Sequence, residues 1–185
     1  MIFPVDKFAK VEIEQRNDIR ASKERLTRNR ARGTKSPYFA LMLTTPSIPY
    51  NEYIPLSAAV DGYEGALEIF VVQNPIPSIY ENENDNTIDF EPKGSKTIGI
   101  DYTGNYSAGD FIQFSGSTKA YRIMEVDGQS ITLTHPLLTD IAAGESVYYG
   151  KNVQFQMCVN DTHTTTIDVK QSKFGIIDVE LIEQL

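Results

Sequence analysis

The sequence predicts a mainly β protein with a single helix. Three observations carry this prediction: apolar and polar residues alternate along many short segments, turn-forming residues separate those segments, and only one segment spaces its apolar residues as a helix does. With 185 residues, the chain is long enough for one sizeable core, or for a core with a small inserted module.

The first half of the chain supplies two strands and the helix. Residues 10–15 (KVEIEQ) alternate apolar and polar, and residues 36–46 (SPYFALMLTTP) form an aromatic-aliphatic strand that ends at a proline. The helix is predicted near residues 48–62, with Ser47 as its cap and Pro49 in its first turn. Its rough apolar stripe consists of Tyr50, Tyr53, Ile54, Leu56 and Val60.

The second half is predicted to be almost entirely strands. Residues 66–75 form a strand, and residues 75–95, rich in Pro, Asn and acidic residues, form a loop. Strands follow near 110–114, 119–126 and 130–135, and Asp127-Gly128 is a hairpin signal between the last two. Two alternating segments close the chain, with Val153, Phe155, Met157 and Val159 on one face of the first and Ile177, Val179 and Leu181 in phase on the second.

The charges are distributed unevenly. Residues 16–35 hold eight of the 17 basic residues and two acidic ones, which gives this segment a net charge of +6. The remaining 9 basic and 23 acidic residues give −14. A basic segment on an acidic body can meet nucleic acid or the acidic body of a neighbouring copy, and the overall acidity disfavours nucleic acid. A third interpretation is that the basic segment is simply a solvated charged face. The segment itself fits either a helix or a strand, and its apolar content is too low to bury much in either form.

No motif indicates catalysis, so we expect no enzyme activity, no cofactor and no metal site. The two histidines, His135 and His163, lack further ligands at metal-binding spacing. The single cysteine, Cys158, excludes an internal disulfide and is predicted to be buried. The acidic residues of the 75–95 loop do not follow the pattern of a calcium-binding loop, which favours a solvated loop.

The tyrosines allow a different reading. Tyr102, Tyr106, Tyr148 and Tyr149 can line a carbohydrate-binding or protein-binding surface, although tyrosine is also common on half-buried faces of sheets. No apolar run approaches the roughly 20 residues that a membrane helix needs, and the N-terminal segment lacks the layout of a secretory signal.

Several short sequence segments follow one another in a recognisable order along nearly the whole chain. Phe3-Pro4 comes first, RASKERLTRNRAR leads into YFALMLTTP, and NEYIPLSAAVDGYEG precedes ALEIFVV. SAGDFIQFSGSTKAYRIMEV then opens a module that ITLTHPLLTDIAAGESV completes, and VQFQMCVND and FGIIDVELIEQL form a final hairpin. In this order the chain resembles tailed-bacteriophage tail proteins of the distal-tail or baseplate type, with the module at Gly109-Asp110 as the most specific part.

The resemblance implies a fold and a role. The fold would be a tail-tube-like β-sandwich, residues 1–108 and 150–185, with a flanking helix and a small inserted β-barrel at residues 109–149. The protein would be a structural virion protein, made in the host cytoplasm, that forms part of an oligomeric ring at the distal end of the tail. Its partners would be other copies of itself and tail-tube, hub or fibre proteins, with no membrane. A head-tail connector or adaptor, a fibre-attachment ring protein and a host-surface carbohydrate-binding module are the alternatives.

Two groups of residues are the candidates for these roles. The arginines of the basic segment are expected to pair with acidic residues of an adjacent copy or of an inner tail protein: Arg25, Arg28, Arg30 and Arg32. Gly109 and Asp110 are expected to fix the turn that enters the barrel, and Asp127 and Gly128 to close its hairpin.

Overall fold

The computed structural model describes residues 5–16, 19–22, 30–33, 37–62, 69–76, 85–101, 106–160, 164–167 and 174–184. The chain divides into two compact units. We call residues 70–156 the barrel unit, and residues 4–69 with 157–184 the sheet unit. Strands predominate in both, and the described residues contain one α-helix, so the predicted mainly β fold with one helix and a small barrel is confirmed.

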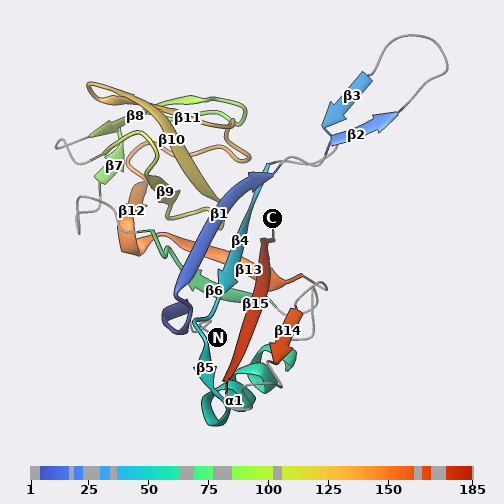
Figure 1. Ribbon diagram of the computed structural model, residues 1–185. Helices are drawn as coiled ribbons and strands as arrows, with labels where there is room; N and C mark the ends of the chain where they lie inside the picture. The colour runs from blue at the N-terminus through green and yellow to red at the C-terminus, as the bar shows by residue number, and fades with distance from the viewer. Residues whose placement is uncertain are drawn as a thin grey trace. The chain divides into compact units, whose positions relative to one another are not determined.

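The barrel unit contains a closed barrel of six antiparallel strands (Figure 1). These are β7 (Asp85–Thr87), β8 (Thr97–Asp101), β9 (Phe111–Phe114), β10 (Ala120–Asp127), β11 (Ser130–Leu133) and β12 (Ser146–Tyr149). Their order around the barrel is β10-β11-β8-β7-β12-β9, and β9 pairs with β10 to close it. Each strand therefore has a neighbour on both sides.

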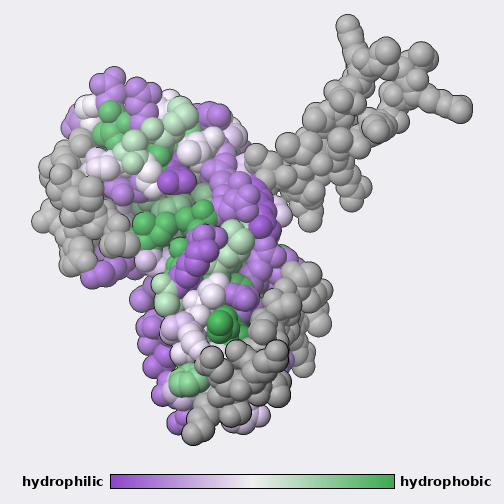
Figure 2. Space-filling view, in the orientation of Figure 1, coloured by the Kyte–Doolittle hydropathy of each residue, from purple (hydrophilic) through white to green (hydrophobic). Residues whose placement is uncertain are grey.

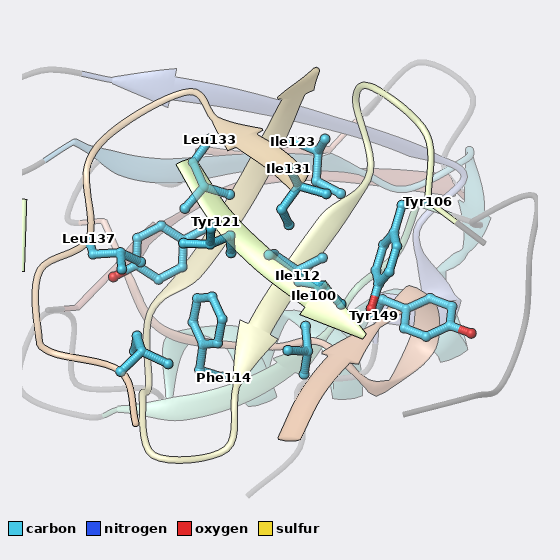
Figure 3. Close-up of a cluster of buried hydrophobic side chains, with 13 residues drawn as sticks. Ile100, Tyr106, Ile112, Phe114, Tyr121, Ile123, Ile131, Leu133, Leu137 and Tyr149 are labelled. Carbon is cyan, nitrogen blue, oxygen red and sulfur yellow. The ribbon is translucent and has the colours of Figure 1, made fainter. Parts of the chain in front are cut away.

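The barrel interior is filled by apolar side chains from β8, β9, β10, β11 and β12 and from the connecting segments, and Figure 3 shows this cluster. Ile112, Phe114 and Tyr121 are fully buried, and the Tyr121 hydroxyl accepts a hydrogen bond from the Leu138 backbone N–H at 3.0 Å. The rings of Phe114 and Tyr121 meet edge to face, with their centroids 5.7 Å apart. Because a buried phenol needs a partner, this hydrogen bond lets a tyrosine occupy the core.

The barrel extends further toward the N-terminus than the predicted module of residues 109–149. It includes β7 and β8, and β7 lies in the segment 75–95 that the sequence predicts to be a loop. The polar residue Thr87 fits into this strand because its hydroxyl donates to the Ala142 carbonyl at 2.7 Å and accepts from the Glu145 N–H at 2.9 Å. A polar composition therefore concealed a strand in which the buried hydroxyl of Thr87 is hydrogen-bonded.

The sheet unit is built on long antiparallel strands. They are β1 (Lys10–Arg16), β4 (Tyr38–Thr44) and β15 (Phe174–Glu183), to which β5 (Ile48–Pro49), β14 (Thr164–Ile167) and β13 (Gln154–Val159) add. The strand order is β1-β4-β15-β13-β6, where β6 is Phe70–Gln73, and β13 runs from the barrel unit into the sheet unit. The register places Ile13, Leu41 and Leu181 in one row. The predicted inward faces of β13 and β15 are confirmed as buried.

The helix α1 (Tyr50–Asp61) lies within the predicted range, but two details of the prediction are wrong. Pro49, and not Ser47, occupies the N-cap position, and no side chain caps the helix. Of the predicted apolar stripe, Tyr53 is buried whereas Tyr50 is 47% exposed. Tyr53 packs over Gly175, where an added Cβ would lie 2.1 Å from Cδ2 of the ring. The close approach of the tyrosine ring explains why this strand position is a glycine.

The basic segment contains a β-hairpin, which decides between the two conformations left open by the sequence. Strand β2 (Ile19–Ser22) pairs antiparallel with β3 (Arg30–Gly33), and Arg20 lies opposite Arg32 in the register. Among the described residues, these two strands pair with each other and with no other strand. The described residues contain no helix long and apolar enough to cross a membrane.

Candidate functional site

The predicted interface arginines are only partly covered by the structure. Arg25 and Arg28 lie outside the described residues, and Arg30 and Arg32 belong to β3. Their pairing with acidic residues of another chain therefore stays a prediction.

One face of the sheet unit is acidic, and we call it the acidic face. Its charged residues come from β1 and β15: the carboxylates are Glu12, Glu14, Asp178 and Glu180, and the cations are Lys10 and Arg16. The register aligns Glu12, Met42 and Glu180 across the three strands, and hydrophilic residues follow β1 in Figure 2. A shallow hollow of about 270 Å³ lies on this face.

Ion pairs order the acidic face. The Arg16 guanidinium contacts Glu14 at 2.9 Å and also contacts Glu180. These pairs, with the hydrogen bond to Glu14 as the largest cause, raise the pKa of Arg16. The Lys10 ammonium lies 2.8 Å from Glu12, whose hydrogen bond raises the pKa of Lys10. With four carboxylates and two cations, the face keeps an excess of negative charge.

Gly109 and Asp110 form the turn that leads into β9. Gly109 has a φ of 99°, a conformation that other residues adopt only with strain. Its N–H donates to the Ile123 carbonyl, the Ile123 N–H donates to the Asp110 carbonyl, and the Asp110 carboxylate accepts from the Ser107 N–H at 2.9 Å. The pair thus joins the entrance of β9 to β10.

Asp127 and Gly128 lie at the hairpin between β10 and β11. Asp127 pairs with Ser130, so Gly128 and Gln129 are the two loop residues. Gly128 has a φ of 57° at the first loop position, where both common two-residue hairpin turns require a positive φ.

The structure separates the four tyrosines that the sequence offered as one surface. Tyr106 and Tyr149 are buried, with ring centroids 5.0 Å apart, and both belong to the barrel core (Figure 3). Tyr102 lies outside the described residues. Tyr148 alone of the described three is partly exposed, because alternation along β12 turns it away from the interior that Tyr149 fills. A surface built from Tyr106 and Tyr149 is therefore ruled out.

Tyr148 lines a polar groove of about 410 Å³ in the barrel unit, which we call the amide groove. Its other lining residues come from β6, β9, the short 3₁₀ helix η3 (Gly150–Asn152) and β13: Gln73, Gln113, Lys151, Asn152 and Gln154. A second hollow of about 180 Å³ shares Gln113, Tyr148 and Gln154 with it, so the two are contiguous. The sequence prediction missed this groove because its residues are scattered over about 80 positions of the chain.

Gln113 holds the floor of the amide groove. Its side-chain amide donates to the Gln154 carbonyl at 2.9 Å, and its carbonyl oxygen accepts from the Gln154 N–H at 2.9 Å. Both ends of one carboxamide are thus bound to the backbone of β13. Tyr148 lies directly opposite Gln113 in the β12–β9 register, which places its ring beside this clamp.

The titratable residue with the largest change of pKa is buried in the barrel core. His135 is 2% exposed and stacks on Tyr121, and burial together with the nearby Lys119 and Lys96 lowers its pKa to about 4. The described residues contain no group of three or more His, Cys, Asp or Glu that could hold a metal ion. The Glu91 carboxylate of the acidic loop accepts from the Gly99 N–H at 3.0 Å, which is a structural role. His163 lies outside the described residues.

A scan against models of known protein families gives no match, and a search among curated proteins gives none either.

Proposed function

We propose that this protein is a structural subunit of a virion, part of an oligomeric ring at the distal end of a bacteriophage tail. There it would scaffold neighbouring tail or fibre proteins. The resemblance in the order of sequence segments motivates the proposal. The observation that carries it is the charge complementarity within one chain. Residues 17–35, which exclude Arg16 of the acidic face, have a net charge of +5, and the sheet unit presents an acidic face.

A ring of identical subunits needs two different surfaces that fit each other, because each copy meets one neighbour on each side. The basic hairpin β2–β3 and the acidic face are two such surfaces. A hairpin of two four-residue strands is marginally stable alone in water, so contact with a neighbouring copy would stabilise it.

The edge of the sheet offers a second means of association. Strand β1 is seven residues long and ends the strand order, so one row of its backbone N–H and C=O groups faces no other strand among the described residues. Such edges pair readily with strands of another chain. Ion pairs along the exposed side of β1 would set which strand is accepted.

Charge reversal of the basic hairpin tests the proposal. The triple variant Arg28→Glu, Arg30→Glu and Arg32→Glu should abolish rings of purified protein in negatively stained images, because repulsion replaces attraction at every contact. The matched control, with lysine at the same three positions, keeps the charge and should still form rings. Rings formed equally well by the glutamate variant would refute the proposed contact.

The position of the protein along the tail requires a separate experiment. Immunogold labelling of intact virions should place the protein at the distal tip. Label at the junction of head and tail would instead support the head-tail connector or adaptor, and label along fibres the fibre-attachment ring. Absence of label from purified virions would contradict the virion proposal altogether.

A further inference from the structure

The amide groove has no part in the proposed ring contacts, and its chemistry is specific enough to indicate a ligand. Of its six lining residues, four carry a carboxamide, one a phenol and one an ammonium group, and none carries a carboxylate. The chain has 25 acidic residues, yet no carboxylate is among the lining residues of this groove. The composition of the lining therefore favours a particular class of ligand.

Carboxamides and hydroxyls share a property that decides the ligand class. Each offers a hydrogen-bond donor and an acceptor within one small group, which matches the hydroxyls of a sugar, because these also donate and accept. Sites for apolar ligands are lined mainly by hydrophobic side chains, and this lining is polar. Nucleic acid requires several cations to neutralise phosphates, and the groove has Lys151 alone.

The groove combines a fixed floor with available side chains. Gln113 is held at both ends by Gln154, so the floor needs no reordering when a ligand binds. The side chains of Gln73, Asn152 and Gln154 are exposed and make no hydrogen bond to another described residue. They are therefore available to a ligand in place of water.

Tyr148 supplies the apolar contact that a sugar also needs. It is partly buried, and it lines both the main groove and the contiguous hollow. The C–H face of a pyranose ring packs on an aromatic ring while the hydroxyls at its rim reach polar side chains. Beyond Tyr148, the second hollow adds the hydroxyl-bearing residues Ser115, Ser117 and Thr118, which extends the polar lining for a second sugar unit.

We propose that the amide groove binds a saccharide chain, with one sugar ring on Tyr148 and its hydroxyls hydrogen-bonded by Gln73, Asn152 and Gln154. The main groove, at about 410 Å³, lies within the roughly 300–1,000 Å³ range of small-molecule sites. The proposal does not depend on the ring, because every lining residue belongs to the barrel unit.

An array of neutral and acidic hexose and hexosamine oligosaccharides, probed with the purified full-length protein, tests this site. Wild-type protein should bind at least one oligosaccharide, whose affinity is then measured by titration calorimetry. The double variant Gln73→Ala and Asn152→Ala should weaken that affinity by about tenfold or more, as expected for the loss of two hydrogen bonds. Tyr148→Ala should weaken it to a similar extent through loss of the stacking surface.

Two controls make the result decisive. Gln129→Ala removes an exposed carboxamide in the hairpin loop outside the groove and should leave the affinity unchanged. Gln73 and Asn152 are exposed, so their double variant should keep the wild-type thermal midpoint. Binding to no oligosaccharide, or equal binding by all variants, would overturn the proposal. The charge-reversed hairpin variant should bind the oligosaccharide as wild type does, which separates this site from the ring.

Discussion

The barrel and the sheet complete their strand pairing in different ways. Around the barrel, each of the six strands pairs on both sides, and one set of buried side chains fills the interior. One edge of the sheet is β1, and the sheet presents a charged face whose side chains form ion pairs. The side chains inside the barrel make apolar contacts instead. Closure removes strand edges, and edges are where chains associate. The comparison indicates that the six-stranded barrel is self-sufficient in strand pairing, whereas the open sheet has backbone groups and charges available for another chain.

The largest expected effect lies in the barrel core. Phe114→Ala should destabilise the barrel by about 3–5 kcal/mol, because the ring is fully buried and its removal leaves a cavity. Hydrogen exchange followed by mass spectrometry should show lost protection in β9, β10 and β12 and little change in β4 and β15. The control Met124→Ala, at a position 53% exposed on β10, should change protection little. Equal loss of protection in both units would contradict the self-sufficiency of the barrel.

The matching test in the sheet unit adds atoms instead of removing them. Gly175→Ala should destabilise the packing of α1 on β15 by about 3 kcal/mol, because the new methyl group would overlap the Tyr53 ring. Denaturant unfolding, with hydrogen exchange at α1 and β15, measures the loss. In a Tyr53→Ala background the same substitution should cost far less, since the overlapping ring is gone. Additive costs of the two substitutions would show that the close contact is not the cause.

The smallest expected effect is a loss of stability at acidic pH, caused by His135 in the barrel core. The pKa of His135 is about 4 in the folded state, against an ordinary value of about 6.5 in the unfolded chain. Between these pH values the unfolded state binds a proton that the folded state rejects, so stability falls as the pH drops from 6.5 to 4. The loss should reach about 2–3 kcal/mol.

Urea unfolding across that pH window, for wild type and His135→Gln, isolates the contribution of His135. Carboxylates titrate in both proteins, so the difference between the two stabilities reports the histidine alone. The wild type should lose more stability than the variant on acidification. Parallel pH profiles would contradict a buried neutral His135.

Elements with strong local signals were predictable. Alternation alone places Phe155 and Met157 on the buried face of β13, because the side chains of a strand change sides at every residue. The positive φ of Gly109 and Gly128 follows from the turns that their neighbours form. The helix was predicted in place, but not the burial of its side chains, since Tyr50 and Ile54 are apolar and nevertheless exposed.

The site was less predictable than the fold. Tyr148 and Tyr149 are adjacent in the sequence and are the same type of residue, yet Tyr148 lines the groove and Tyr149 belongs to the core. Alternation along β12 predicts that the two side chains lie on opposite faces of the strand. Which of the two faces is buried depends on the closed barrel. The lining of the amide groove comes from five separate elements, and no local pattern links Gln73 to Gln154.

The sequence by itself determined the strand character of most segments, the position of the helix, the turns at Gly109 and Gly128, and the separation of a basic segment from an acidic remainder. These depend on the local preferences of the backbone and on composition. The tertiary structure alone decided that β7 is one of the barrel strands, which tyrosine faces outward, and where the amides gather. These depend on contacts between residues far apart in the chain, whose pairing is fixed only when the whole fold satisfies its hydrogen bonds and fills its core.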